Sequence, residues 1–250
     1  MEPVYPETRY NRAYVDTPAP TISIIIPAHN EEALLGVTLD ALGAAGRALG
    51  EMVEIVVVDD ASTDRTAAVA RERGAQVVPV NVRQIGAARN AGARVARGSL
   101  LVFVDADTTV PPAVLEATVA AIRDGAVGGG AMVEFDAGAP PWAKRALVAT
   151  CWILKTARWA AGCYVFATRE AFERAGGFDE RFFASEEIHL SRALKRIGRF
   201  VIIPAPVTTS GRKADAYSLR HTLWMTAALV VRPGSLKRRD RLEYWYDWRP

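Results

Sequence analysis

The sequence predicts a single α/β domain built on a mostly parallel β-sheet. Runs of β-branched and apolar residues alternate with helix-like segments through the first half of the chain. Strands that alternate with helices form βαβ units, whose crossovers leave neighbouring strands parallel. The chain has 250 residues, of which 50% are hydrophobic and 24% charged, so it has enough apolar material for one sizeable core.

The first half gives the clearest pattern. Residues 21–26 are mostly β-branched and stop at Pro27, which predicts a buried strand. Asn30 stands where it can cap a helix from Glu31 to about Ala45. The elements expected next are a strand at 52–58, a helix capped by Ser62 or Asp64 and ended by Gly74, a strand at 75–80, a helix at 85–97, a strand at 100–104, and a helix opened by Pro111 and Pro112 that runs to about residue 124.

The second half is less regular. Its expected elements are a strand at 126–135, an apolar helix at 142–160, a strand at 163–167, a short helix capped by Thr168 and closed by Gly176 and Gly177, a helix at 186–197 behind Ser185, and a strand at 200–207. We therefore divide the single domain into halves at 21–125 and 126–214. An irregular arm (1–20) precedes it and a helical tail (215–250) follows it.

Composition narrows the partners and the location. The net charge is +3, and no basic run is interleaved with aromatic residues, so we expect no nucleic-acid binding. Cys151 and Cys163 fit neither a zinc site nor a redox pair, which favours a reducing compartment. The start lacks a signal-peptide pattern and no apolar run reaches about 18 residues. We expect a cytoplasmic protein whose tail packs on the domain, with peripheral contact to the inner face of the membrane as the alternative.

Three polar segments follow predicted strands. They are residues 27–31, Asp59-Asp60 and 105–107, and they should meet at the carboxyl edge of the sheet, where such folds bind ligands. Asp105 and Asp107 are two residues apart, so both carboxylates can face one hard divalent cation. The alternative for this pair is an Asx-type turn.

Other candidates depend more on context. Asp59 or Asp60 can accept a hydrogen bond from a base N–H, or cap the following helix. Glu186 and Glu187 can supply a general base, or simply favour the start of their helix electrostatically. The remaining candidates are Arg83, Arg89, Arg94 and Arg212 for a diphosphate and His221 as a further metal ligand.

Five segments together resemble one known family. They occur in family order and extend over roughly residues 20–212: SIIIPAHNEE (23–32), VVVDDASTD (56–64), GAARNAG (86–92), FVDADT (103–108) and GGFDERFFASEE (176–187). In this combination they resemble family 2 glycosyltransferases of the GT-A fold.

The resemblance implies roles for the matching positions. Residues 21–125 would bind the nucleotide sugar and residues 126–214 the acceptor. Glu187 matches the catalytic base, where an Asp following a Glu is more usual, and Glu186 is the alternative. The donor-side residues would be Pro27, Ala28 and Glu31 around the nucleoside, Asp59 and Asp60 at the base, Arg89 and Arg212 at the phosphates, Asp105 at the ribose or sugar, and Asp107 at the metal, with Asp105 and His221 as further ligands.

The implied activity is a single, inverting transfer from a nucleotide diphosphate sugar to an acceptor hydroxyl. We expect UDP rather than GDP, Mg²⁺ or Mn²⁺ as cofactor, and an acceptor that is a sugar, a lipid-linked group or a small molecule. The Gln-x-x-Arg-Trp pattern of processive members is absent. Two alternatives stay open: a haloacid-dehalogenase-like phosphatase with Asp105 as nucleophile and Asp107 as acid/base, and a non-catalytic relative that only binds a nucleotide sugar.

Overall fold

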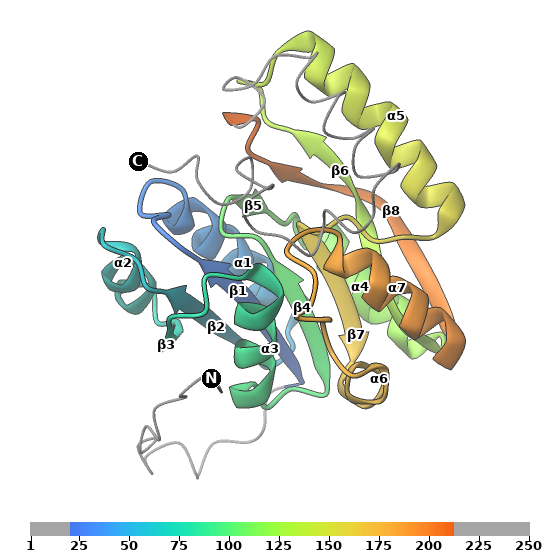
Figure 1. Ribbon diagram of the computed structural model, residues 1–250, viewed down its shortest axis with the longest axis horizontal. Helices are drawn as coiled ribbons and strands as arrows, with labels where there is room; N and C mark the ends of the chain where they lie inside the picture. Colours follow the sequence, from blue (N-terminus) through green and yellow to red (C-terminus); the bar gives the residue numbers. More distant parts are fainter. Residues whose placement is uncertain (1–20, 213–250) are drawn as a thin grey trace.

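The computed structural model describes residues 21–212, which form one α/β unit around an eight-stranded sheet (Figure 1). The strand order is β3-β2-β1-β4-β7-β6-β8-β5. The elements of the first half are β1 (Ile22–Ala28), α1 (Leu35–Leu49), β2 (Val53–Asp60), α2 (Thr66–Glu72), β3 (Gln76–Val80), α3 (Ile85–Val95) and β4 (Leu100–Val104). Those of the second half are β5 (Thr108–Thr109), α4 (Pro112–Arg123), β6 (Ala126–Phe135), α5 (Pro141–Ala157), β7 (Tyr164–Thr168), α6 (Arg169–Ala175), α7 (Glu186–Ile197) and β8 (Arg199–Thr209).

The sheet is mostly parallel, as predicted. Strands β3, β2, β1 and β4 are parallel neighbours, and β6 is parallel to β8. Strand β7 is antiparallel to both β4 and β6, so it joins the two halves of the sheet, and β5 is antiparallel to β8. The first four strands therefore end at one edge, and the second half is attached beside it.

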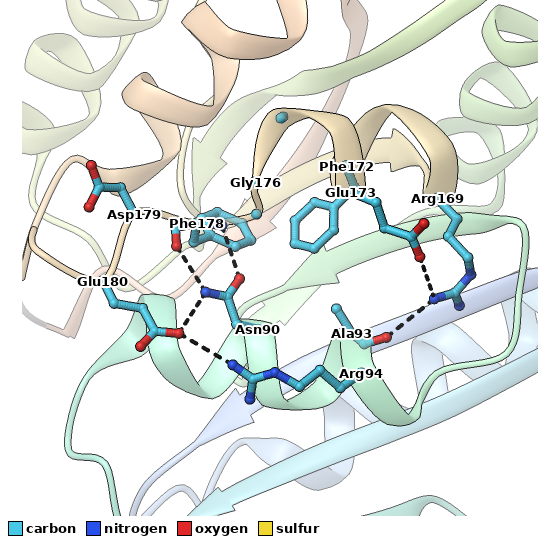
Figure 2. Close-up of a pocket in the computed structure, with 12 residues that line it drawn as sticks. Asn90, Ala93, Arg94, Arg169, Phe172, Glu173, Gly176, Phe178, Asp179 and Glu180 are labelled. Atoms are coloured by element: carbon cyan, nitrogen blue, oxygen red, sulfur yellow. Dashed lines mark hydrogen bonds and ion pairs between the residues drawn. The ribbon is translucent and has the colours of Figure 1, made fainter. Parts of the chain in front are cut away.

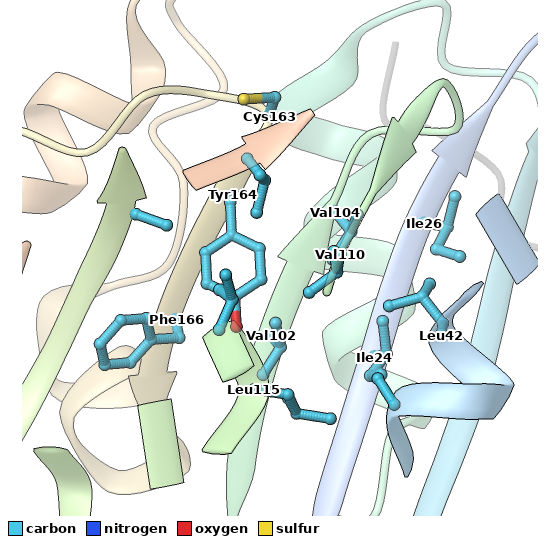
Figure 3. Close-up of a cluster of buried hydrophobic side chains, with 14 of the residues drawn as sticks. Ile24, Ile26, Leu42, Val102, Val104, Val110, Leu115, Cys163, Tyr164 and Phe166 are labelled. Atoms are coloured by element: carbon cyan, nitrogen blue, oxygen red, sulfur yellow. The ribbon is translucent and has the colours of Figure 1, made fainter. Parts of the chain in front are cut away.

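Helices cover both faces of the sheet because strand residues alternate between two cores. Ile24 and Ile26 pack into the core under α1, α2 and α4, whereas Ile25 packs into the core under α3, α6 and α7. Figure 3 shows the first core, where Tyr164 of β7 lies among aliphatic side chains. The Tyr164 hydroxyl is 2.9 Å from Thr118 Oγ1, so the buried phenol is hydrogen-bonded.

Several predicted helix starts are corrected. Helix α1 begins at Leu35, not Glu31, because Asn30 has a left-handed backbone (φ 51°) and its Oδ1 accepts a hydrogen bond from Thr63 N at 2.8 Å. Residues 30–32 are therefore bonded to the loop before α2. Asp64 rather than Ser62 bonds the first turn of α2, with Oδ1 2.9 Å from Thr66 N.

Some of the other helix ends and caps also differ from the prediction. Thr168 caps α6 as predicted, through Ala171 N at 3.2 Å. Ser185 precedes α7 in a left-handed conformation (φ 63°) and makes no side-chain cap bond. Helix α5 ends at Ala157 instead of residue 160, because Arg158 is left-handed (φ 51°). The two-residue strand β5 was not predicted; it exists only through its pairing with the end of β8.

Within residues 21–212, no helix combines the length and apolarity needed to cross a bilayer.

Candidate active site

A small pocket lies at the carboxyl edge of β1, β2 and β4. It measures about 70 Å³, and most of the predicted donor-side residues line it. Its lining is Pro27, Ala28, His29, Glu31, Asp60, Ile85, Ala88, Asp105, Ala106 and Asp107. Three sequence segments that are far apart in the chain thus meet in one place, as predicted from the order of strands and helices.

The guanidinium of Arg212 pairs with two carboxylates that line this pocket. Its Nη2 lies 2.5 Å from Glu31 Oε2 and 3.3 Å from Asp107 Oδ2. The other oxygen of Asp107 accepts a longer hydrogen bond from Thr209 Oγ1 at 3.4 Å. Glu31 is 2% exposed, so its charge depends on this partner. Two carboxylates from different motifs therefore already share one positive charge.

The carboxylate oxygens of Glu31 and Asp107 are ligands that suit a hard divalent cation. Carboxylate oxygens are the ligands that Mg²⁺ and Mn²⁺ prefer, and phosphate oxygens and water complete such sites. Among residues 21–212, no group of three His, Cys, Asp or Glu side chains is close enough to hold a metal alone. Asp107, the predicted metal ligand, lies at this point with one carboxylate oxygen 3.3 Å from Arg212 Nη2. The predicted ligand His221 lies outside the described residues.

Arg89 links two of the predicted carboxylates. Its Nη2 donates to Asp105 Oδ1 at 2.8 Å, and its Nη1 donates to Glu186 Oε1 at 2.7 Å. Nη2 also donates to the Gly162 carbonyl at 2.7 Å. Burial lowers the pKa of Arg89, but the charges of Asp105 and Glu186 outweigh it and raise the pKa overall. The side chain is 1% exposed, so it acts inside the protein, as a positioning residue between the two motifs.

Glu186 and Glu187 have different surroundings. Glu186 is buried and bound to Arg89; burial raises its pKa, and the Arg89 charge partly offsets this. Glu187 is only partly buried. It lies close to Gly162, since a Cβ atom placed on Gly162 would be 3.6 Å from Glu187 Cδ. Burial, followed by the charge of Glu186, raises the pKa of Glu187 to about 8. Since Arg89 already engages Glu186, the geometry favours Glu187 as the proton acceptor.

Asp59 and Asp60 are engaged with backbone. Asp60 Oδ1 accepts from Val82 N at 2.8 Å and Arg83 N at 2.9 Å, and its Oδ2 accepts from Gln84 N at 3.2 Å. Asp59 Oδ1 accepts from Ser62 N at 3.2 Å. The Asp60 carboxylate has about four acceptor positions, so three backbone bonds leave one for a ligand. Asp60 therefore shapes the pocket loop as well as lining it.

The other two predicted arginines, Arg83 and Arg94, lie in different places. Arg83 approaches His29 at the pocket, with Nη1 2.6 Å from His29 Nε2. Arg94 lies in a different hollow of about 790 Å³ between α3 and α6, 3.5 Å from Glu180 (Figure 2). Apart from Arg94, none of the predicted site residues lines that hollow. Its charged groups pair with one another, for example Arg169 with Glu173 at 3.8 Å.

Sequence reasoning missed three supporting residues. Asn90 accepts from Phe178 N at 2.9 Å and donates to Phe178 O at 2.8 Å, which fixes the loop before α7 (Figure 2). Gln84 Nε2 donates to the carbonyls of Glu180 and Phe182 at 2.6 and 2.9 Å. Gly162 supplies the carbonyl for Arg89. Asn90 lies inside a segment that had been singled out; Gln84 and Gly162 gave no signal in sequence.

The thiols contribute no disulfide. Cys151 and Cys163 are both free and buried. Burial raises the pKa of Cys163 well above its ordinary value, and the nearby Asp105 and Asp107 charges add to the effect. A thiol in this setting stays protonated at neutral pH, so it is a poor nucleophile.

Comparison with known proteins identifies the class. The fold matches nucleotide-dependent glycosyltransferases: a mannosyltransferase from Pyrobaculum calidifontis solved with GDP-Man and Mn²⁺ has a TM-score of 0.63 at 24% identity, covering 86% of this chain and 65% of that one. Glucosyl-3-phosphoglycerate synthase from Mycobacterium tuberculosis, solved with Mn²⁺ and UDP, has a TM-score of 0.60 at 22% identity, covering 87% and 80%. These likenesses establish the GT-A fold.

A match to a protein-family model identifies the family. The model described as "Glycosyl transferase family 2" matches residues 23–179, and the chain belongs to that family. Family membership makes the phosphatase alternative wrong. The alternative of a non-catalytic relative that only binds a nucleotide sugar stays open.

Curated relatives match over a shorter stretch. An undecaprenyl-phosphate 4-deoxy-4-formamido-L-arabinose transferase from Pseudomonas paraeruginosa is 44% identical over 102 residues, 38% of this chain and 30% of the relative. A validoxylamine A glucosyltransferase from Streptomyces hygroscopicus subsp. jinggangensis is 39% identical over 108 residues, 41% of this chain and 25% of the relative. The matched part thus spans less than a third of either relative.

Proposed function

We propose that the protein transfers one sugar from a nucleotide diphosphate sugar to an acceptor hydroxyl, with inversion and with a divalent cation. The observation that carries this proposal is the pocket at the carboxyl strand edge, where residues of three motifs meet. Beside it, Arg89 links Asp105 to Glu186, the neighbour of Glu187 in sequence. We keep UDP as the first candidate nucleotide and GDP as the second. Neighbours of this fold were solved with either one, which supports both candidates.

The chain's own residues divide the work. Glu187 takes the proton of the acceptor hydroxyl, for which its raised pKa of about 8 is well matched. Arg89 holds Asp105 and Glu186 in place, so that the donor edge and the base keep a fixed spacing. Pro27, Ala28 and Asp60 form the nucleoside wall.

Asp107 would hold the cation, Mg²⁺ or Mn²⁺, which would neutralise charge on the departing diphosphate. Arg212 presently pairs with Asp107 and Glu31, and a pocket of about 70 Å³ is far below the roughly 300 Å³ that ligand sites need. Donor binding therefore moves Arg212 away from Asp107, and its guanidinium becomes available to the phosphates.

The acceptor is proposed from the relatives. A relative named for undecaprenyl phosphate supports a lipid-linked acceptor, and one named for validoxylamine A supports a small molecule. We propose a cytoplasmic location, because nucleotide sugars are available there.

Calorimetric titration tests the donor site. UDP and GDP, each with and without Mn²⁺, are titrated into the wild type, into Asp107→Ala, and into Asp124→Ala, which removes an exposed carboxylate outside the pocket. The proposal expects Mn²⁺-dependent binding that is lost in Asp107→Ala and kept in Asp124→Ala. Absence of nucleotide binding under every condition, or equal binding by both variants, would contradict it.

A further inference from the structure

Helix α5 carries an exposed apolar face. Val148, Trp152 and Ile153 are 71%, 68% and 56% exposed, and among residues 21–212 they are three of the five exposed large hydrophobic residues. Only Ala143 and Cys151 of the helix are buried. Val148 and Trp152 are four residues apart, so they lie on the same side, with Ile153 beside them. The helix lies along the outer side of β6 (Figure 1), so this face is directed away from the sheet.

The same helix is strongly basic. Residues 141–158 contain Lys144, Arg145, Lys155 and Arg158 and no acidic residue. Helix α7 continues the basic surface, because Arg192 stacks over the Trp159 ring at 4.8 Å and Lys195 Nζ donates to Ala157 O at 2.9 Å. The chain as a whole has a net charge of only +3, so this surface holds much of its positive excess.

We propose that the α5 face, defined by Val148, Trp152, Ile153, Arg145 and Lys155, binds the surface of an anionic lipid bilayer. An apolar stripe with an aromatic residue enters the headgroup boundary, while flanking Lys and Arg side chains meet lipid phosphates. A second copy of the chain fits this face less well, because a two-fold interface would bring the same basic residues against each other.

The α5 face is connected to the active site through a short segment. The residues after α5 lie against the catalytic pair: Ala160 N donates to Ser191 Oγ at 3.0 Å, and Ser191 Oγ donates to Glu187 O at 2.8 Å. Two residues later, Gly162 O accepts from Arg89. Binding of α5 to a bilayer therefore places the acceptor side of the site near the membrane. The binding itself does not depend on the proposed reaction.

Vesicle co-sedimentation of the full-length protein tests this. Phosphatidylcholine vesicles are compared with vesicles in which part of the lipid is phosphatidylglycerol, at low and high salt. We expect binding to the anionic vesicles only, weakened by salt because the attraction is electrostatic in part. The triple variant Val148→Ser, Trp152→Ser, Ile153→Ser should bind at least about tenfold more weakly, because it removes the apolar contact. The double variant Arg145→Gln, Lys155→Gln should bind more weakly and depend less on salt than the wild type, because two of the basic side chains of this surface are removed.

The control is the double variant Val37→Ser, Met52→Ser, which removes the other two exposed large hydrophobics, located outside α5. It should bind like the wild type. Circular dichroism and thermal melting check that each variant is folded, which exposed positions should permit. The proposal is overturned if the wild type does not bind anionic vesicles, or if the triple variant binds as well as the control. It is equally overturned if light scattering shows a dimer that only the triple variant dissociates, since the face would then be a self-interface.

Discussion

Removal of Arg89 should destabilise the fold through Glu186. In Arg89→Met, Glu186, which is 4% exposed, loses the Arg89 guanidinium 2.7 Å from its carboxylate, the only ion-pair partner that it has within residues 21–212. Breaking a buried pair by removing one partner costs about 3–5 kcal/mol. The second pair, with Asp105, adds little because the Asp105 side chain is 36% exposed and solvent screens it. We therefore expect a loss of about 3–5 kcal/mol in the free energy of unfolding at pH 7.

The loss should depend on pH with a definite sign. Without the Arg89 charge, which lowers its pKa, the pKa of Glu186 in the folded state rises further above the unfolded value of about 4.3. A raised folded pKa favours folding while the group is protonated, so the deficit of the variant shrinks as pH falls and grows as pH rises. Urea unfolding of both proteins from about pH 5 to 8 measures this difference.

A second substitution guards against a variant that fails to fold. In Arg89→Met, Glu186→Gln the buried charge is gone, so most of the lost stability should return. Glu180→Gln in the same background is the matched control, since Glu180 is paired with Arg94 in the other hollow. If Arg89→Met costs less than about 1 kcal/mol, or if both double variants recover equally, the account of Arg89 is refuted.

Three further predictions concern the site and the core. The transfer rate should rise with pH through about 8 as Glu187 loses its proton, and Glu187→Gln should keep UDP binding but lose turnover by at least about 100-fold; a flat pH profile would contradict this. Arg212→Ala should lower the melting temperature, and Mn²⁺ should raise that temperature more than in the wild type, because the cation no longer competes with a guanidinium; equal shifts would refute the shared-charge account. Tyr164→Phe should cost about 1 kcal/mol in urea unfolding by removing the buried bond to Thr118, and no change would show that bond to be without net effect.

The sequence by itself determined the class of fold and the position of the site. Apart from the two-residue strand β5, period and turn residues were sufficient for the order of strands and helices in 21–125, since each βαβ unit is specified by local patterning. The carboxyl-edge site followed from that order, because parallel strands end together. Family membership could be inferred from five segments in order, before any geometry was known.

Tertiary structure alone decided how the polar side chains pair. Local propensity predicted Asn30 as a helix cap. In the structure the Asn30 side chain bonds Thr63 instead, and α1 begins four residues later than predicted. Arg89 was expected at the donor phosphates, yet burial and two carboxylates more than ten residues away hold it inside the protein. Polar contacts at the site join residues up to 181 positions apart, as Glu31 and Arg212 are, and no local pattern encodes the partner of a buried charge. The same reason separates Glu186 from Glu187: they are adjacent in sequence, but only the fold pairs Glu186, and not Glu187, with Arg89.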